Sequence, residues 1–174
     1  TTGQVRAQNR GEWLVLDDAP PQFKSLGRWL APRQAALATA LGPDLILYGE
    51  WCYARHSVGY DQLPDWFLAF DLYDRRQEAF WSAARRDAWC QAQSLARVPS
   101  LGHGHYTMAD LRSLLGQSRL GQTAAEGLYL RHDEGDWLVS RAKLVRPEFV
   151  QAIGEHWSRQ ALSRNRLAAG VVWH

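Results

Sequence analysis

The chain has 174 residues, of which 46% are hydrophobic and 22% are charged, as expected of one globular domain with a sizeable core. The formal net charge is only +2, so affinity for nucleic acid would have to come from a local basic patch and not from the overall field. No apolar run approaches membrane-spanning length and no signal peptide is visible, so we expect no association with a membrane.

In the first half of the chain the pattern predicts strands on either side of one long helix. Residues 4–16 alternate loosely around a turn at residues 9–11, which predicts two short strands. Apolar residues at helical spacing predict a single helix over residues 22–41. Residues 45–53 and 66–73 are apolar and aromatic, which predicts two strands of buried type.

In the second half, residues 80–96 are expected to be helical. Thr107 with Asp110 predicts a capping box that opens a short helix. Residues 125–131 and 137–145 read as a hairpin around a polar turn, and Pro147 suits the first turn of a last helix reaching about residue 157. The basic segment from residue 159 is expected to be a frayed tail.

These elements predict an α+β fold with mostly antiparallel strands packed against helices. We expect one domain over residues 1–167, with residues 168–174 as a tail. Cys52 and Cys90 are isolated and lack metal-ligand spacing, so they indicate reduced cysteines of a cytoplasmic protein.

Two strands carry acidic residues in apolar surroundings. Glu50 lies among aromatic residues, where an unpaired carboxylate is costly to bury; pairing with an arginine at a strand end is the structural alternative. The second strand carries Phe70 and ends in Asp71, and one of its phenylalanines is a candidate to stack on a purine.

The predicted hairpin carries two cations on one face. Strand alternation aligns Arg141 with Lys143, and like charges at this spacing repel unless an anion lies beside them. A solvated edge strand is the alternative, but apolar residues intersperse these cations, which favours phosphate binding.

Two other patterns are weaker. His103 and His105 lack a third ligand at suitable spacing for a metal. Lys24 and Gly27 match the KxxG pattern around a nucleotide-carrying lysine, but this lysine follows a proline-rich turn and leads into a helix. We therefore interpret the match as coincidence. The only other lysine is Lys143, and arginine cannot be deprotonated to act as an amine nucleophile.

Four segments, in this order, resemble motifs of bacterial ATP-dependent RNA ligases. The segment of residues 8–11 resembles the basic stretch downstream of motif I, and residues 47–74 resemble motifs III and IIIa. Glu126-Gly-Leu-Tyr-Leu-Arg131 is similar to motif IV, and Arg141-Ala-Lys-Leu-Val145 is similar to motif V. The resemblance covers almost the whole chain, and the order of the motifs makes it more specific than any one of them.

The resemblance implies a nucleotidyltransferase domain of the type found in DNA and RNA ligases and capping enzymes. It implies joining of RNA 5′-phosphate and 3′-hydroxyl ends through lysyl-adenylate and RNA-adenylate intermediates, with ATP and Mg²⁺ or Mn²⁺. The residues that it assigns are these: Glu50 to the ribose, Phe70 to adenine, Asp71 to support of that strand or its metal, Glu126 to the divalent metal, Lys143 and Arg141 to phosphate, and Arg10 to phosphate or substrate.

The nucleotidyl lysine of motif I has no match, and we expect it upstream of residue 1, so that this chain does not adenylate itself. Two alternatives stay open. One is a non-catalytic nucleotide- or RNA-binding remnant of the fold. The other is a DNA ligase or capping-type nucleotidyltransferase.

Overall fold

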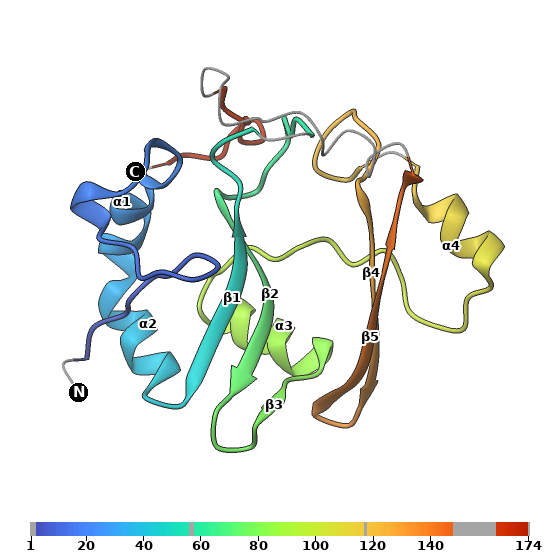
Figure 1. The fold of residues 1–174 in the computed structure, drawn as a ribbon, viewed down its shortest axis with the longest axis horizontal. Coiled ribbons are helices and arrows are strands. Elements are labelled where there is room, and N and C mark those ends of the chain that lie inside the picture. Colours follow the sequence, from blue (N-terminus) through green and yellow to red (C-terminus); the bar gives the residue numbers. More distant parts are fainter. Residues whose placement is uncertain (1–2, 56–57, 117, 148–162, 174) are drawn as a thin grey trace.

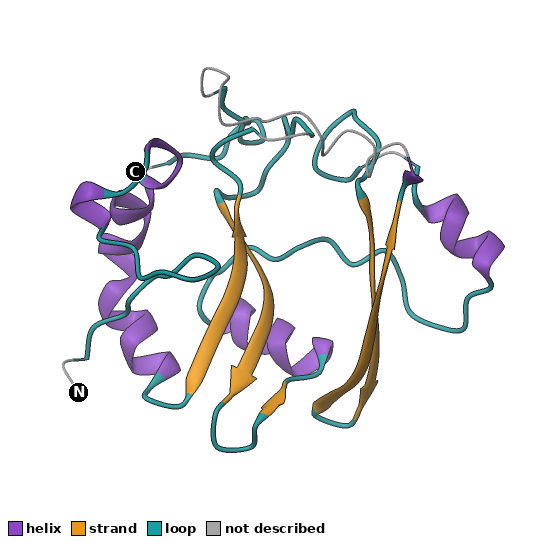
Figure 2. Cartoon of the chain, in the orientation of Figure 1, coloured by secondary structure: helices purple, strands orange, loops and turns teal. Residues whose placement is uncertain are grey.

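The computed structural model describes residues 3–55, 58–116, 118–147 and 163–173. The described part is a mixed α+β structure with antiparallel sheets, as predicted (Figures 1 and 2). Its helices, including 3-10 turns (η), and its strands are, in chain order, η1 Leu16–Asp18, η2 Pro21–Phe23, α1 Leu26–Leu30, η3 Ala31–Arg33, α2 Gln34–Leu41, β1 Leu45–Trp51, β2 Phe67–Asp74, β3 Ala79–Phe80, α3 Ala83–Ala92, α4 Met108–Leu114, β4 Gly127–Glu134 and β5 Trp137–Val145.

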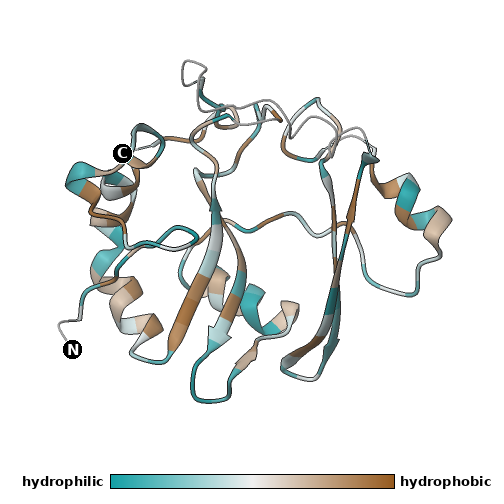
Figure 3. Cartoon of the chain, in the orientation of Figure 1, coloured by the Kyte–Doolittle hydropathy of each residue, from teal (hydrophilic) through white to brown (hydrophobic). Residues whose placement is uncertain are grey.

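The first sheet has the order β1-β2-β3, with β2 in the middle. Leu68, Ala69 and Leu72 of β2 are almost completely buried, as predicted for this strand. The expectation of a buried first strand was wrong, because β1 is an edge strand in this sheet and most of its residues are only half-buried. The apolar residues of β1 gather in its first half, which is brown in Figure 3.

A β-bulge interrupts the pairing of β1 with β2. Tyr48 pairs with Asp71 and Gly49 pairs with Ala69, so Phe70 has no partner on β1. A bulge bends its strand and re-aims the side chains next to it. Phe70 and Asp71, the two residues singled out in this strand, therefore lie at an irregularity that period-2 alternation does not predict.

The segment expected to be one helix is broken. Residues 21–41 form η2, α1, η3 and α2 in succession, because Pro32 has no amide hydrogen and its ring clashes with the preceding turn of a continuous α-helix. Arg33 donates to the carbonyl of Trp29 at 2.8 Å across this break. The short helices still bury their apolar side chains against the sheet: the Trp29 ring lies 5.0 Å from that of Phe67.

The other predicted elements differ mainly at their ends. The expected helix over residues 80–96 is shorter, because Phe80 belongs to β3 and the hydroxyl of Ser82 caps α3 by accepting from the amide of Arg85. The capping box of Thr107 and Asp110 is confirmed at the start of α4. The N-terminal turn forms a single bridge, Gln8 with Trp13, in place of two strands. None of the described helices is long and apolar enough to cross a membrane.

The β4–β5 hairpin forms a second, two-stranded sheet, which docks at its turn end. Trp137 forms a bridge with Trp81, and the amide of Ser82 donates to the carbonyl of Asp136 at 2.8 Å. The amide of Ala83 donates to the carboxylate of Asp133 at 2.7 Å, which satisfies a free donor at the start of α3. The hairpin is thereby tied to β3 and α3.

The end of the described chain packs against the core. Trp173 lies 6.2 Å from the rings of both Tyr53 and Trp66, and the guanidinium of Arg28 lies 4.6 Å from its ring centre. The expectation of a frayed tail was wrong for residues 163–173, because their backbone pairs with the loop after β1. The helix expected after Pro147 lies outside the described residues from 148 onward, and the domain boundary at residue 167 stays a prediction.

Candidate functional site

One face of the β4–β5 hairpin turns toward the three-stranded sheet. Arg131 pairs directly with Arg141, and Tyr129 pairs directly with Lys143. Residues opposite one another in an antiparallel pair project to the same side. Arg131, Tyr129 and Arg141 all reach Asp71 on β2, so Lys143 lies on the face of the hairpin that looks toward β2.

Asp71 is the anion between these cations. Only 1% of this residue is exposed, and its carboxylate accepts a hydrogen bond from the guanidinium of Arg131. A guanidinium nitrogen of Arg141 lies 3.6 Å from the second carboxylate oxygen, and the hydroxyl of Tyr129 lies 3.5 Å from it. Arg131 also donates to the carbonyl of Trp81 at 2.7 Å. This network gives both arginines an anion within the protein.

From the sequence, Arg141 and Lys143 were the expected cations on this face, and phosphate binding by them stays a prediction. Arg131, whose side chain is only 10% exposed, was given no role. Strand alternation carried the missing signal, because Arg131 and Arg141 both occupy odd positions of the predicted hairpin. Arg141 keeps an exposed fraction of 48% and is available to a ligand as well as to Asp71.

A group of aromatic rings on the three-stranded sheet lies beside Arg141. Its guanidinium lies 4.7 Å from the centre of the Phe80 ring. Tyr48 lies 5.7 Å from Phe80 and 6.4 Å from Phe70, with the rings tilted toward one another. Half-buried aromatic faces beside a cation form a surface on which a flat base can stack. Phe70 is thus placed among such rings, while Tyr48 and Phe80 were not predicted.

The charges of the two predicted glutamates, Glu50 and Glu126, raise the pKa of the same two side chains, Cys52 and Tyr60. Burial first, then the negative charges of Glu50 and Glu126, raise the pKa of the Cys52 thiol from 9.0 to about 12. Burial and then Glu126, the largest of its charge effects, also raise the pKa of the Tyr60 phenol, and Glu50 contributes to the same rise. The carboxylates come from segments 76 positions apart in sequence (126 − 50). The fold therefore brings both carboxylates close enough to influence the same two groups, Cys52 and Tyr60.

Glu50 is exposed and Glu126 is half-buried. No group of three or more His, Cys, Asp or Glu residues in the described part of the chain could hold a metal ion by itself. Mg²⁺ is commonly held by one or two carboxylates together with substrate phosphates and water. Glu50 and Glu126, with Lys143 and Arg141 on the hairpin, fit such a shared site and do not fit an all-protein cage.

The remaining predicted residues are exposed. Lys143 lies on β5, and Arg10 lies in the N-terminal turn, where the backbone amides of Gly11 and Glu12 donate to the side chain of Asn9. Lys24 is exposed and follows η2, whose Gln22 carbonyl accepts a hydrogen bond from the indole of Trp51 at 2.7 Å. The structure brings Asp71 and Arg141 together on the face that carries Lys143, and it places Phe70 beside Tyr48.

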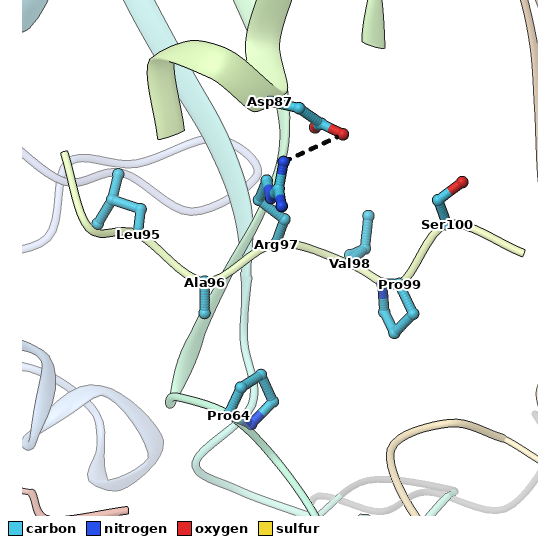
Figure 4. Close-up of a pocket in the computed structure, with 8 residues that line it drawn as sticks. All are labelled: Pro64, Asp87, Leu95, Ala96, Arg97, Val98, Pro99 and Ser100. Carbon is cyan, nitrogen blue, oxygen red and sulfur yellow. Dashed lines mark ion pairs between the residues drawn. The ribbon is translucent and has the colours of Figure 1, made fainter. Parts of the chain in front are cut away.

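A separate cavity of about 300 Å³ lies beside the segment after α3, whose residues Ala96 and Val98 pair with Ala69 of β2. Figure 4 shows the Arg97–Asp87 ion pair, 3.2 Å long, at its edge. Its lining includes Pro64, Val98 and Ser100 but none of the predicted site residues. The arginine at this cavity is already paired with Asp87, and no predicted site residue lines the cavity, so it does not extend the candidate site.

Residues 1–145 match the model of the family described as RNA ligase. That match includes every residue that the sequence assigned to the site, from Arg10 to Lys143. No curated protein and no solved structure matches the chain.

Proposed function

The chain belongs to the RNA ligase family, whose model matches 145 of its 174 residues, and on that premise we propose that it is an ATP-dependent adenylyltransferase domain with the nucleotidyltransferase fold. In this proposal the domain joins RNA 5′-phosphate and 3′-hydroxyl ends, and its nucleotide site lies between the three-stranded sheet and the β4–β5 hairpin. The lysine that carries AMP is neither Lys24 nor Lys143.

One observation carries the proposal: residues from β1, β2, β4 and β5 supply complementary chemistry around one place. Glu50 and Glu126 both influence Tyr60, the Phe80 ring lies against Arg141, and Lys143 lies on the same hairpin face as Arg141. A nucleotide with a divalent ion needs each of these: oxygen ligands for the ion and ribose, a flat apolar surface for the base, and cations for the phosphates.

Apart from that of Asp71, the proposed roles are those that the resemblance to RNA ligases implies for each residue. Glu50 accepts hydrogen bonds from ribose hydroxyls, and Glu126 serves the divalent ion. Phe70 stacks on adenine, and Asp71 holds Arg141 in place. Lys143 and Arg141 offset the charge that develops on the phosphate. ATP supplies the phosphoanhydride whose cleavage drives the reaction, and Arg10 contacts the phosphate of the substrate.

Ligation of a pre-adenylated RNA tests this proposal in the chain as it stands. In the last step the 3′-hydroxyl oxygen of the acceptor attacks the 5′-phosphorus of the donor, the anhydride bond breaks, AMP leaves and the hydroxyl proton goes to solvent. No nucleotidyl lysine takes part in that step. We expect joined RNA and free AMP in the presence of Mg²⁺ or Mn²⁺, and strong loss of both in Glu126→Gln and Lys143→Ala.

Two controls decide between the proposal and its alternatives. Binding of ATP with no joining of pre-adenylated RNA would favour a non-catalytic nucleotide- or RNA-binding remnant. Preference for GTP, or for DNA ends over RNA ends, would favour the capping-type or DNA ligase alternative. Intact mass after incubation with ATP and the divalent ion checks the lysines: an added AMP on Lys24 or Lys143 would contradict the assignment.

A further inference from the structure

The segment of residues 163–173 lies beyond the part of the chain that the family model matches, yet it packs against the strand exit that follows Glu50. Its backbone pairs with the loop after β1: the amide of Arg55 donates to Ser163 at 2.9 Å, and the amide of Arg166 donates to Tyr60 at 2.8 Å. Figure 1 shows this segment, in red, crossing the end of β1. The segment therefore covers the loop that follows the strand carrying Glu50.

Asn165 is the buried centre of this contact, with 6% of its surface exposed. Its side-chain amide donates to the carbonyls of Cys52 and Ala54, at 2.8 and 3.2 Å. Its side-chain oxygen accepts from the backbone amide of Tyr60 at 2.8 Å. One side chain thus satisfies three buried backbone groups on both sides of a single loop, and each of them would be costly to leave without a partner.

The groups that Asn165 holds lie next to the candidate site. Cys52 and Ala54 lie two and four positions after Glu50 in the chain, and the thiol of Cys52 lies 3.8 Å from the carbonyl of Glu50. The charges of Glu50 and Glu126 both raise the pKa of the Tyr60 phenol. A change in the backbone at residues 52–54 and at Tyr60 would therefore move the end of the strand that carries Glu50 and the Tyr60 ring.

We infer that Asn165 is a positioning residue for recognition of the ribose, acting through the backbone around Glu50 and Tyr60. The inference rests on the proposed function, because it requires ATP to bind with its ribose at Glu50. Asn165 lies outside residues 1–145, which the family model matches. Asn165 itself does not touch the nucleotide in this account.

The difference in affinity of the chain for ATP and for 2′,3′-dideoxy-ATP, which lacks the ribose hydroxyls, tests this role. Calorimetric titration in Mg²⁺ gives a dissociation constant for each nucleotide, and their ratio reports how well the ribose hydroxyls are held. For the unchanged chain we expect the dideoxy nucleotide to bind about tenfold or more weakly, as for a hydrogen bond to a charged group. In Asn165→Ala we expect this ratio to fall to about threefold or less.

Two further variants separate positioning from a loss of stability. Asn165→Asp keeps the size of the side chain and the oxygen that faces Tyr60, but it places an oxygen against the carbonyls of Cys52 and Ala54; we expect the same fall in the ratio. Leu167→Ala removes packing from the same segment and leaves the hydrogen bonds of Asn165 intact. We expect it to lower the melting temperature and keep the ratio.

The outcomes are distinct. A ratio that stays near tenfold in both Asn165 variants, or that falls equally in Leu167→Ala, overturns the inference while leaving nucleotide binding intact. If the unchanged chain binds the two nucleotides with nearly equal dissociation constants, Glu50 does not bind the ribose hydroxyls and the inference fails as well. Absence of ATP binding and of joining by the unchanged chain overturns the proposed function itself.

Discussion

Asp71 on β2 and Arg131 on β4, 60 positions apart in the sequence, form the buried ion pair that holds the β4–β5 hairpin against the three-stranded sheet. Their side chains are 2% and 10% exposed. Charge pairs at this depth stabilise a structure only if both partners stay, because each charge has been taken out of water. The pair also fixes the face on which Arg141 and Lys143 lie.

Removal of one partner of this ion pair should therefore lower the stability of the folded chain strongly. We expect Asp71→Ala to lower the free energy of unfolding by up to about 3–5 kcal/mol, because it leaves the buried guanidinium of Arg131 with only the carboxylate of Asp133, 3.5 Å away, as a charged partner. The double variant Asp71→Leu with Arg131→Met should lose less than Asp71→Ala. Urea unfolding measures both. As a control, Arg76→Ala breaks an exposed pair with Asp44 and should cost less than about 1 kcal/mol; an equal cost would contradict this account.

Gly49 is required by the ring of Phe67. A Cβ atom at position 49 would lie 2.1 Å from the ring of Phe67, a distance that no real contact has. We expect Gly49→Ala to destabilise the chain by about 1–3 kcal/mol through forced movement of the ring or of β1. Thermal unfolding measures this. Gly11→Ala, where an added Cβ meets nothing within 4 Å, is the matched control, and Phe67→Leu should partly rescue Gly49→Ala. Equal melting temperatures for the two glycine variants would refute the steric explanation.

Lys143 should matter for binding and not for folding. Its side chain is exposed on β5, so Lys143→Ala should leave the melting temperature nearly unchanged. If it contacts phosphate, the affinity for ATP should fall about tenfold, as for a charge-assisted hydrogen bond. Calorimetric titration measures this. As a control, Lys24→Ala removes the other lysine, which has no role in the proposal, and this variant should bind ATP normally. A similar loss of affinity in both variants would indicate a nonspecific effect of charge.

The buried thiols predict a loss of stability at alkaline pH. Burial, with the charges of Glu50 and Glu126, raises the pKa of Cys52 from 9.0 to about 12, and burial raises the pKa of Cys90 to about 11. The unfolded chain loses these protons near pH 9 while the folded chain keeps them. The stabilisation is thus complete below pH 9 and falls as the pH rises toward 12, by at most about 1.4 kcal/mol per pH unit for each thiol.

Urea unfolding between pH 8 and pH 10.5 checks this prediction. Cys52→Ala should lose less stability over that interval than the unchanged chain, although it is less stable at pH 8 because it leaves a small cavity. Parallel curves for the two proteins would show that Cys52 does not contribute to the pH dependence.

Local patterns in the sequence were enough to find the main elements. The hairpin, β2 and the capping box of α4 each depend on neighbours within a few residues, and each was found with ends shifted by a few positions at most. The two main failures have different causes. Pro32 is a local one, because it interrupts a helical spacing. The edge position of β1 is not local, because it depends on which strands pair, and hydrophobic periodicity does not contain that information.

The sequence by itself determined the residue types of the site, their order and the family to which they belong. Only the tertiary structure decided which side chains meet. Asp71 takes Arg131 as its main partner, Phe80 lies against Arg141, and Asn165 closes the loop after Glu50. Each contact joins residues at least 60 positions apart, so its geometry depends on the bulge in β2, on the docking of the hairpin and on the return of the chain at residues 163–173. Burial fixes these pairings, because a charge or an amide taken out of water must be satisfied by whichever partner the fold brings within reach.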